Sequence, residues 1–280
     1  MTHLAIVTGT THGIGRVTAR ELARAGCSVL MLCRDLAAAG AVREEILRVV
    51  PGAEIDSIRC DLSSLRSVRE CARAVRAGFG TLKLLINNAG MVSTRHRMSE
   101  DGFELTFASN HLGPFLLTRL LLDRMEPDGR IINVASRAHY PGKMDLETVA
   151  DPRARYRSMA AYSRSKLANI MFTIALARRL QGTGVTANCL HPGVVATNLL
   201  PRWLQVIKPL LSLVMFDSER GARTTLYLAL SDEVAGSSGQ YFDEHHVVRT
   251  ASPIANDRAL QETLWSASEG WTGLRTNTAG

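Results

Sequence analysis

The sequence predicts an α/β fold in which a parallel sheet of seven strands carries helices on both faces. The main observation is that short apolar runs alternate with amphipathic segments along the chain. This order implies right-handed βαβ crossovers and a doubly wound sheet. The second observation is size, because 280 residues with 46% hydrophobic side chains suit one large domain over residues 1–280.

The elements follow from the apolar runs and from the residues that interrupt them. The predicted strands cover residues 3–8, 28–33, 54–60, 82–87, 130–135, 185–190 and 239–242. The predicted helices cover 14–25, 36–50, 63–77, a stretch of two helices over 99–126, 160–180 and 218–230. Gly26 should end the first helix and Pro51-Gly52 the second, while Ser63 is the expected N-cap of the third. Gly113-Pro114 should disturb the start of the second helix within 99–126.

The composition argues against several classes of protein. The formal charge is +7, but the arginines are scattered rather than gathered in a stripe or reader motif, so no nucleic-acid partner is predicted. The charge could attract a multiply phosphorylated ligand or simply form a solvated surface. Five cysteines without metal-ligand spacing favour no metal site and a reduced, cytoplasmic location. Neither a signal peptide nor an unbroken transmembrane segment is predicted.

A glycine-rich segment, Thr8-Gly9-Thr10-Thr11-His12-Gly13-Ile14-Gly15, directly follows the first predicted strand and opens the first helix. Glycines let the backbone turn tightly and approach a pyrophosphate, to which the helix N-terminus presents free N–H groups. The spacing G-x-x-x-G-x-G differs from the commoner G-x-G-x-x-G, and an ordinary βα turn is the alternative. The strand-turn-helix context favours dinucleotide binding.

The end of the second strand, Cys33-Arg34-Asp35, bears on the choice of dinucleotide. An acidic residue there usually binds the ribose hydroxyls of NAD, whereas an arginine suits the 2′-phosphate of NADP. Arg34 comes first, Asp35 is the expected N-cap of the next helix, and Arg16 and His12 could add contacts. NADP(H) is therefore preferred over NAD(H), with an ordinary surface role for Arg34 as the alternative.

Two further strand ends carry polar residues. Asp61, followed by Leu62, could accept a hydrogen bond from an adenine amino group or simply start the next helix. Asn87-Asn88-Ala89-Gly90 would let a nucleotide lie against the backbone, although it could be a simple turn. In parallel sheets ligands bind at this edge, where the strand order reverses.

Tyr162 and Lys166 lie four residues apart in a predicted helix and therefore share one face. There the ammonium could lower the pKa of the phenol from its ordinary value of about 10. Such a phenol is a candidate general acid or base. Alone, the pair could equally be two ordinary helix residues.

Taken together, these residues make the chain resemble the short-chain dehydrogenase/reductase superfamily, whose fold is a Rossmann domain. The resemblance covers essentially the whole chain and rests on 8–15, 87–90, Asn110, Ser136, Tyr162, Lys166 and His191-Pro192-Gly193. Within the superfamily the chain is most similar to the retinol dehydrogenase-like branch. The similar segments are 33–35, 110–113, 162–172, 180–185, 191–195, 239–242, Leu264-Trp265 and the long insertion 137–161.

The resemblance implies an active-site quartet of Asn110, Ser136, Tyr162 and Lys166. Tyr162 would exchange a proton with the substrate oxygen, Ser136 would hydrogen-bond that oxygen, and Lys166 would also hold the nicotinamide ribose. Asn110 would hold a helix irregularity and a water connected to Lys166. The implied cofactor contacts are Gly9, Thr11, His12, Gly13, Ile14, Gly15, Arg34, Asp61, Leu62, Asn88, Ala89, Gly90, Tyr162, Lys166, Pro192, Gly193, Val195 and Thr197.

The resemblance also implies a division into two halves. Residues 1–130 would mainly bind the dinucleotide, and 131–280 would carry catalysis and the substrate, with an apolar lid over about 197–216. The segment 199–216 could cover an apolar substrate, touch a membrane surface or simply pack on the domain. The chain departs from the branch at His12 and Pro114, and it is expected to be without the amino-terminal anchor of several relatives. A homodimer, a homotetramer and a monomer are all compatible with the superfamily.

The expected function is that of an NADP(H)-preferring oxidoreductase, of the carbonyl reductase type, which interconverts a hydrophobic aldehyde or ketone and its alcohol. The alternative is a catalytically silent NADP-binding protein that senses redox state through a partner. The complete quartet argues against this alternative, since a retired enzyme would be expected to lose Tyr162 or Lys166.

Overall fold

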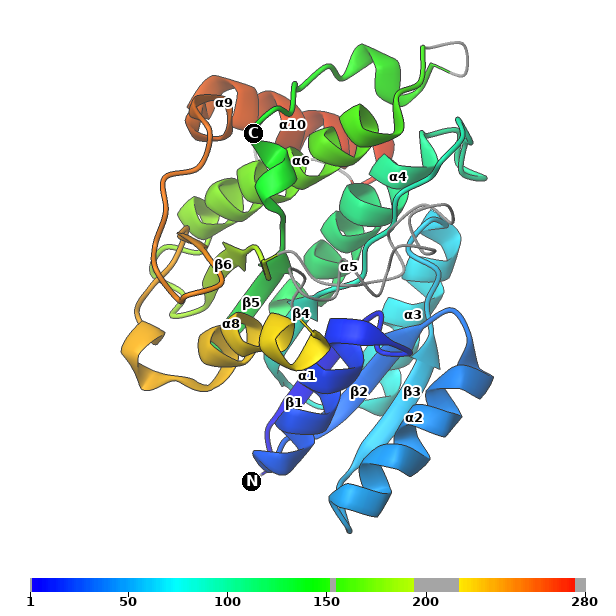
Figure 1. Cartoon of the computed structure of the whole chain (residues 1–280), viewed down its shortest axis with the longest axis vertical. Helices are drawn as coiled ribbons and strands as arrows, with labels where there is room; N and C mark the ends of the chain where they lie inside the picture. Colours follow the sequence, from blue (N-terminus) through cyan, green and yellow to red (C-terminus); the bar gives the residue numbers. More distant parts are fainter. Residues whose placement is uncertain (1, 152–154, 194–216, 275–280) are drawn as a thin grey trace.

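The centre of the molecule is one seven-stranded sheet with the strand order β3-β2-β1-β4-β5-β6-β7 (Figure 1). The structure is a computed structural model that describes residues 2–151, 155–193 and 217–274. Every neighbouring pair of strands is parallel, and the order reverses between β1 and β4. The strands are β1 (Leu4–Thr8), β2 (Ser28–Cys33), β3 (Ile55–Arg59), β4 (Leu82–Asn87), β5 (Met125–Val134), β6 (Thr186–Leu190) and β7 (Tyr241–Phe242). The predicted fold class is confirmed.

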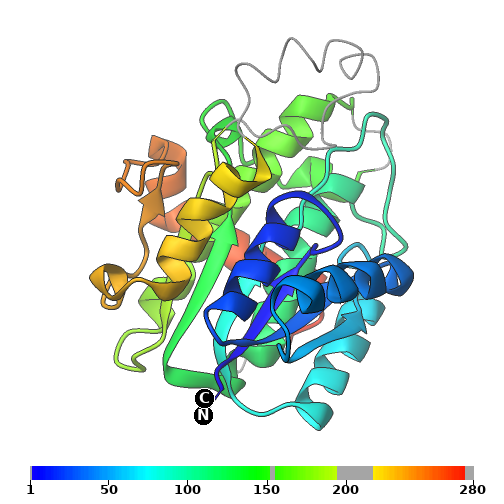
Figure 2. The ribbon, with the colours of Figure 1, turned by 60° about the horizontal axis from the view of Figure 1, so that its bottom comes forward.

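Helices cover both faces of this sheet (Figure 2). One face carries α1 (Gly13–Arg24), α2 (Leu36–Val49) and α8 (Ser218–Leu230), and the other α3 (Leu65–Gly78), α5 (Gly113–Leu121), α6 (Ser158–Arg179) and α10 (Arg258–Trp271). Successive strand residues point to opposite faces. In β1, Ala5 and Val7 therefore pack with the first group of helices and Leu4 and Ile6 with the second. Because both faces are covered, the strand is a continuous apolar run.

The stretch 99–126 differs most from its prediction as two helices. Residues 99–103 form a turn in which the Ser99 N–H donates to the Phe103 carbonyl at 2.7 Å, and helix begins only at α4 (Leu105–Phe107). A π-helical turn (Ala108–Leu112) leads into α5, which a short 3₁₀ turn (Leu122–Arg124) follows. The predicted disturbance at Gly113 has a tertiary cause, because a Cβ there would overlap the Leu62 carbonyl. β5 then begins at Met125 rather than at 130.

Helix caps account for the other differences in boundaries. Ser64, not Ser63 as predicted, caps α3, and its Oγ accepts from the Ser67 N–H at 3.1 Å. Ser63 instead donates its hydroxyl to Asp61 Oδ1 at 2.7 Å. Asp35 is the N-cap of α2 as predicted, since its carboxylate accepts from the Ala38 N–H at 3.0 Å. All other predicted ends agree with the structure to within two residues.

α10, which follows the short α9 (Pro253–Asn256) and is absent from the predicted helices, packs across α5 and α6. Its Trp265 ring lies between two guanidinium groups, with the Arg119 and Arg179 Cζ atoms 4.9 and 3.8 Å from the ring centroid. Its Ser268 Oγ lies 2.9 Å from Nε2 of His111 in the π-helical turn. The C-terminal helix is thereby tied to the turn that carries Asn110.

Acidification is expected to destabilise the fold through His111. Burial lowers the pKa of this imidazole from 6.5 to about 3, so the folded state holds the neutral form. In the unfolded state this histidine is protonated below about pH 6.5, whereas the folded state keeps it neutral. The folded state therefore has its full stability above that pH and loses stability as the pH falls towards 3. At about 1.4 kcal/mol per pH unit, the free energy of unfolding should fall by about 2 kcal/mol between pH 6.5 and 5. Urea denaturation at both pH values would measure the change, and an unaltered pH slope in His111→Asn would contradict it.

Several predictions fall outside the described residues. The lid over 197–216, which includes Thr197, belongs to this group, as do Val195 and residues 152–154 of the insertion. Within the described ranges, no helix is long and apolar enough to cross a membrane. Membrane contact through 199–216, the cytoplasmic location and the oligomeric state stay predictions.

Candidate active site

The loops after β1 and β4 lie together at the carboxyl edge of the sheet, where the strand order reverses. Thr8 Oγ1 accepts from the N–H groups of Asn88 and Ala89, each at 3.0 Å. The Asn88 amide donates back to the Thr8 carbonyl at 2.8 Å. Gly9 has φ of +71°, and a Cβ there would lie 2.9 Å from Ala89. Asn88 and Ala89 therefore hold the glycine turn in shape.

The rest of the glycine motif brings the backbone of α1 against this loop. Gly13 has φ of +61°, in the left-handed region that favours glycine. A Cβ on Gly15 would overlap both the Gly9 carbonyl oxygen and Asn88 Nδ2. The side chain of Ile14 is buried in a cluster shared with α8, so only its backbone faces the turn.

The N-terminus of α1 is open to an anion. The cap residue His12 makes no side-chain bond to the helix, and its Nδ1 lies 3.0 Å from Thr11 Oγ1 instead. The first turn of α1 holds no acidic residue. By contrast, α2, α3, α8 and α10 carry side-chain caps from Asp35, Ser64, Asp217 and Asp257. The Thr10 hydroxyl is buried in the same turn without a partner among the described residues. Free N–H groups, the positive end of a helix and this hydroxyl suit a pyrophosphate.

At the end of β2, the Arg34 guanidinium is available to a phosphate because no nearby carboxylate of the described residues is paired with it. Arg34 is exposed and makes no hydrogen bond or ion pair within the described part of the chain. The Asp35 carboxylate is engaged as the cap of α2. Arg16 is less available than expected, because it pairs with Glu45 at 3.3 Å.

At the end of β3, Asp61 and Leu62 make contacts with residues of the protein itself. The Asp61 carboxylate accepts from both the N–H and the hydroxyl of Ser63. Leu62 is buried in the core, and its carbonyl meets Gly113. The Asp61 carboxylate therefore shapes the start of the next helical segment, and adenine contacts by these two residues stay a prediction.

Tyr162 and Lys166 both lie in α6, with Lys166 Nζ 5.7 Å from the centroid of the phenol ring. Lys166 is 3% exposed, and its Nζ donates to the Val134 carbonyl at the end of β5 at 2.8 Å. Burial lowers the pKa of this ammonium to about 8. A Cβ on Gly90 would lie 3.3 Å from Nζ, so the lysine reaches the loop after β4.

The pKa of Tyr162 is raised above its ordinary value, not lowered as predicted. Burial is the larger cause, and the nearby Ser136 side chain partly opposes it. Lys166 does not lower this pKa because its Nζ is directed at the Val134 carbonyl. The phenol is therefore protonated at neutral pH.

Ser136 is held by a histidine that the sequence motifs do not include. Its Oγ accepts from the Ala138 N–H at 3.2 Å, and its carbonyl accepts from His139 Nδ1 at 2.8 Å. His139 Nε2 accepts from the Ser252 N–H at 3.2 Å. Burial lowers the pKa of His139, in keeping with a neutral ring that bridges these two groups. Only the fold brings residue 252 to this position.

Asn110 is fully buried in the π-helical turn, where a helix irregularity was expected. Its Oδ1 accepts from the Met91 N–H at 2.8 Å, and its Nδ2 donates to the Met91 carbonyl at 2.9 Å and to Ser165 Oγ at 3.0 Å. Ser165 in turn donates to the Tyr162 carbonyl at 2.7 Å. Hydrogen bonds through Ser165 thus connect two of the four quartet members, Asn110 and Tyr162.

The segment His191-Pro192-Gly193 follows β6 at the same edge of the sheet. His191 Nδ1 accepts from the Gly193 N–H at 3.1 Å, and His191 Nε2 lies 2.9 Å from Glu244 Oε2. Gly193 has φ of +79°. Glu244 therefore orients the imidazole that shapes this turn, a contact that the sequence pattern does not contain.

Comparisons with known proteins agree with this arrangement. The family model for short chain dehydrogenases matches residues 3–206. Human retinol dehydrogenase 13 is 39% identical over 96% of this chain and 84% of its own length. A crystal structure of an uncharacterised protein from Mycobacterium paratuberculosis is 35% identical, with a TM-score of 0.80 over 97% of this chain and 93% of the other. A blue fluorescent protein from a metagenomic library, solved in complex with NADPH, is 27% identical, with a TM-score of 0.68 over 86% of this chain and 95% of the other.

The family match covers more than half of the chain, and the identity to human retinol dehydrogenase 13 extends over nearly all of it. The strand order and the glycine turn after β1 lie where a dinucleotide-binding fold requires them. The chain therefore belongs to the short-chain dehydrogenase/reductase family, in its retinol dehydrogenase-like branch.

Proposed function

We propose that this oxidoreductase prefers NADP(H) and interconverts a hydrophobic aldehyde or ketone with its alcohol. The observation that carries the proposal is that Ser136 lies close enough to Tyr162 to influence the pKa of its phenol, with the buried Lys166 one helical turn away in α6. Two hydroxyls on one side of a carbonyl oxygen can both polarise it and supply its proton. The apolar composition of 199–216 and the retinol dehydrogenase relatives support a hydrophobic substrate.

Each quartet member has a separate task in this proposal. Bound NADP(H) supplies or accepts the hydride. Tyr162 gives its proton to the carbonyl oxygen during reduction, and Ser136 donates a hydrogen bond to the same oxygen. Lys166, with a pKa near 8, holds ribose hydroxyls and relays a proton back to the phenol. Asn110 keeps α6 in register with the loop that follows β4.

The raised pKa of Tyr162 gives the proposal a preferred direction. A protonated phenol is ready to act as an acid, which carbonyl reduction needs. Alcohol oxidation needs the deprotonated phenol of Tyr162, so the rate of oxidation should rise with pH. The rate of reduction should not rise over the same pH range.

Changing Arg34 is expected to alter cofactor preference. Its guanidinium is exposed and unpaired within the described residues, while the neighbouring Asp35 carboxylate is engaged in capping. Charge-assisted hydrogen bonds to a phosphate contribute about 1.5–3 kcal/mol, so Arg34→Gln should weaken NADPH binding by about 10–100-fold and NADH binding little. Fluorescence titration with both cofactors would measure this. Arg48→Gln, at an exposed arginine late in α2, is the matched control. Equal losses for both cofactors would contradict the assignment.

The direct test of the function is NADPH oxidation by the purified protein with aliphatic, aromatic and retinoid aldehydes and ketones, with NADH in parallel. Turnover that prefers NADPH is the expected result. A protein that binds NADPH tightly but consumes it with no carbonyl, and forms none from NADP and alcohols, would instead be the silent redox sensor.

A further inference from the structure

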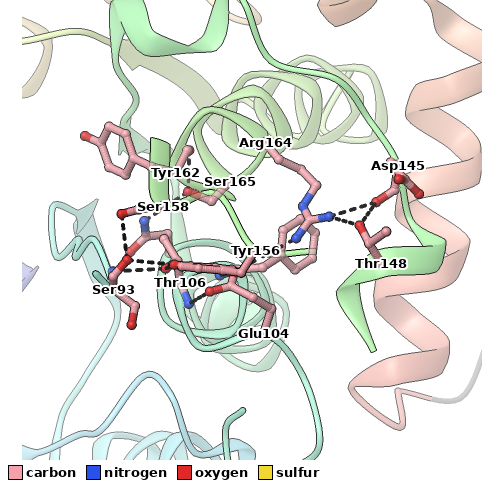
Figure 3. Close-up of polar contacts among 12 residues, drawn as sticks. Ser93, Glu104, Thr106, Asp145, Thr148, Tyr156, Ser158, Tyr162, Arg164 and Ser165 are labelled. Atoms are coloured by element: carbon pink, nitrogen blue, oxygen red, sulfur yellow. Dashed lines mark hydrogen bonds and ion pairs between the residues drawn. The ribbon is translucent and has the colours of Figure 1, made fainter. Parts of the chain in front are cut away.

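One buried ion pair, Glu104 with Arg164, joins the segments that carry the quartet (Figure 3). Arg164 lies in α6 between Tyr162 and Lys166 in sequence and is 8% exposed, while Glu104 is 1% exposed. Arg164 Nη2 and Glu104 Oε2 are 4.0 Å apart. Two charges this deeply buried are costly unless each is paired and hydrogen-bonded, so their other partners are informative.

Glu104 anchors the helical segment that leads to Asn110. Its Oε1 accepts from the Thr106 N–H at 2.8 Å and its Oε2 from the Phe107 N–H at 2.9 Å. Its own N–H donates to the Val149 carbonyl, in the insertion, at 2.7 Å. This carboxylate therefore caps α4, which continues directly into the π-helical turn that carries Asn110.

Arg164 anchors the insertion between Ser136 and Tyr162. Its Nη1 donates to the Asp145 carbonyl at 3.1 Å and to the Thr148 hydroxyl (Figure 3). The guanidinium carbon also lies 5.6 Å from the centroid of the Phe107 ring, next to the residues that Glu104 caps. One planar side chain of α6 therefore contacts both the insertion and the segment before Asn110.

The start of α6 is held by polar contacts on its other side as well. The hydroxyls of Tyr156 and Ser158 both donate to the Ser93 carbonyl at 2.7 Å, in the loop after β4 (Figure 3). The Ser93 N–H donates to Thr106 Oγ1 at 3.2 Å. Directional bonds therefore join the start of α6, this loop and the segment before Asn110, and such bonds allow fewer arrangements than apolar packing does.

We infer that Glu104 and Arg164 are positioning residues that hold α6 in register with the Asn110 turn and with the insertion after Ser136. This inference rests on the proposed function of the quartet. The pair holds the helix that carries Tyr162 against the insertion that follows Ser136, while the pair itself remains behind the site. Neither residue is assigned a contact with substrate or cofactor.

Arg164→Lys tests the inference. Lysine keeps the charge but lacks the planar fork that bonds several groups at once. A small displacement of reacting groups costs about 10–100-fold in rate, so kcat should fall by that factor. The dissociation constant for NADPH should change much less than kcat, because most of the proposed cofactor contacts lie in the loops after β1, β2 and β4, away from α6. Thr148→Val, which removes one anchor and leaves the ion pair, should give a smaller loss of kcat and keeps the test valid if Arg164→Lys folds poorly.

Arg178→Lys is the matched control. Arg178 also lies in α6 and bonds to Gln261 and Glu262 of α10, but about 24 Å along the helix from Tyr162. The Arg178→Lys change should lower the free energy of unfolding while leaving kcat unchanged. Wild-type kcat in both Arg164→Lys and Thr148→Val, or an equal loss of kcat in Arg178→Lys, would overturn the inference.

Amide hydrogen exchange provides a readout that needs no turnover. Arg164→Lys should speed exchange in 104–112 and 158–166, whereas Arg178→Lys should affect the far end of α6 and α10. If the wild type turns over no carbonyl, the proposed function fails, and the exchange pattern still decides the role of the pair. Unchanged exchange in both segments of Arg164→Lys would refute it.

Discussion

Replacing Tyr162 with Phe should reduce kcat for carbonyl reduction by about 10²–10⁴-fold, the usual contribution of a positioned general acid. Only the hydroxyl is lost, since the ring can keep its packing in α6. The structure places that hydroxyl near the Ser136 side chain, and burial raises its pKa so that it is protonated at neutral pH. The variant should therefore bind NADPH like the wild type but transfer almost no hydride to a carbonyl.

Two measurements make this result specific. NADPH fluorescence titration would show that the cofactor still binds, and steady-state kinetics would show that the rate is lost. Tyr227→Phe is the matched control, because Tyr227 lies in α8, away from the quartet, and its hydroxyl donates to Glu233 just after that helix. A Tyr162→Phe variant that keeps more than about a tenth of wild-type kcat would mean that another group is the acid.

Gly15→Ala is expected to abolish tight NADPH binding. A Cβ at this position would overlap the Gly9 carbonyl and the Asn88 amide, the groups that hold the glycine turn in shape. The turn must then move, and the N–H groups at the start of α1 lose their alignment with a pyrophosphate. Backbone displacement of this kind should weaken binding by about 100-fold or more, which corresponds to about 2.7 kcal/mol or more.

Gly40→Ala gives a control of the same chemistry. Gly40 lies inside α2, and a Cβ there would meet nothing within 4 Å. This change should leave NADPH binding intact and stabilise the helix by about 0.5–1 kcal/mol. Isothermal titration calorimetry with NADPH and thermal unfolding would separate the two variants. Equal NADPH affinity in Gly15→Ala and the wild type would show that the glycine turn is not the pyrophosphate site.

The direction of the Tyr162 pKa shift could not be predicted from the sequence. Spacing correctly places Tyr162 and Lys166 on one helix, because positions four apart in α6 share a face. The direction of the shift depends on burial and on where the ammonium points. Those are decided by β5, whose Val134 carbonyl takes up Lys166 Nζ.

Glu104, Arg164 and His139 are the clearest residues that sequence motifs miss. In a sequence, a lone charged residue or histidine resembles a solvated surface position, and the motifs assign these three no role. Their partners lie far along the chain, as with His139 and Ser252 or Arg164 and Glu104. The irregularity at Ala108–Leu112 was expected from the family resemblance and not from apolar periodicity, which there resembles that of an ordinary helix.

The sequence by itself determined the order of strands and helices, the parallel sheet and the glycine turn that opens α1. These features depend on local periodicity and on glycine positions, which act over a few residues. Only the tertiary structure decided how Asn110, Ser136, Tyr162 and Lys166 are held, which side chains lock the glycine turn and which way the pKa values move. The physical reason is that hydrogen bonding and burial arise between residues that are distant in the chain and meet only when the sheet is assembled.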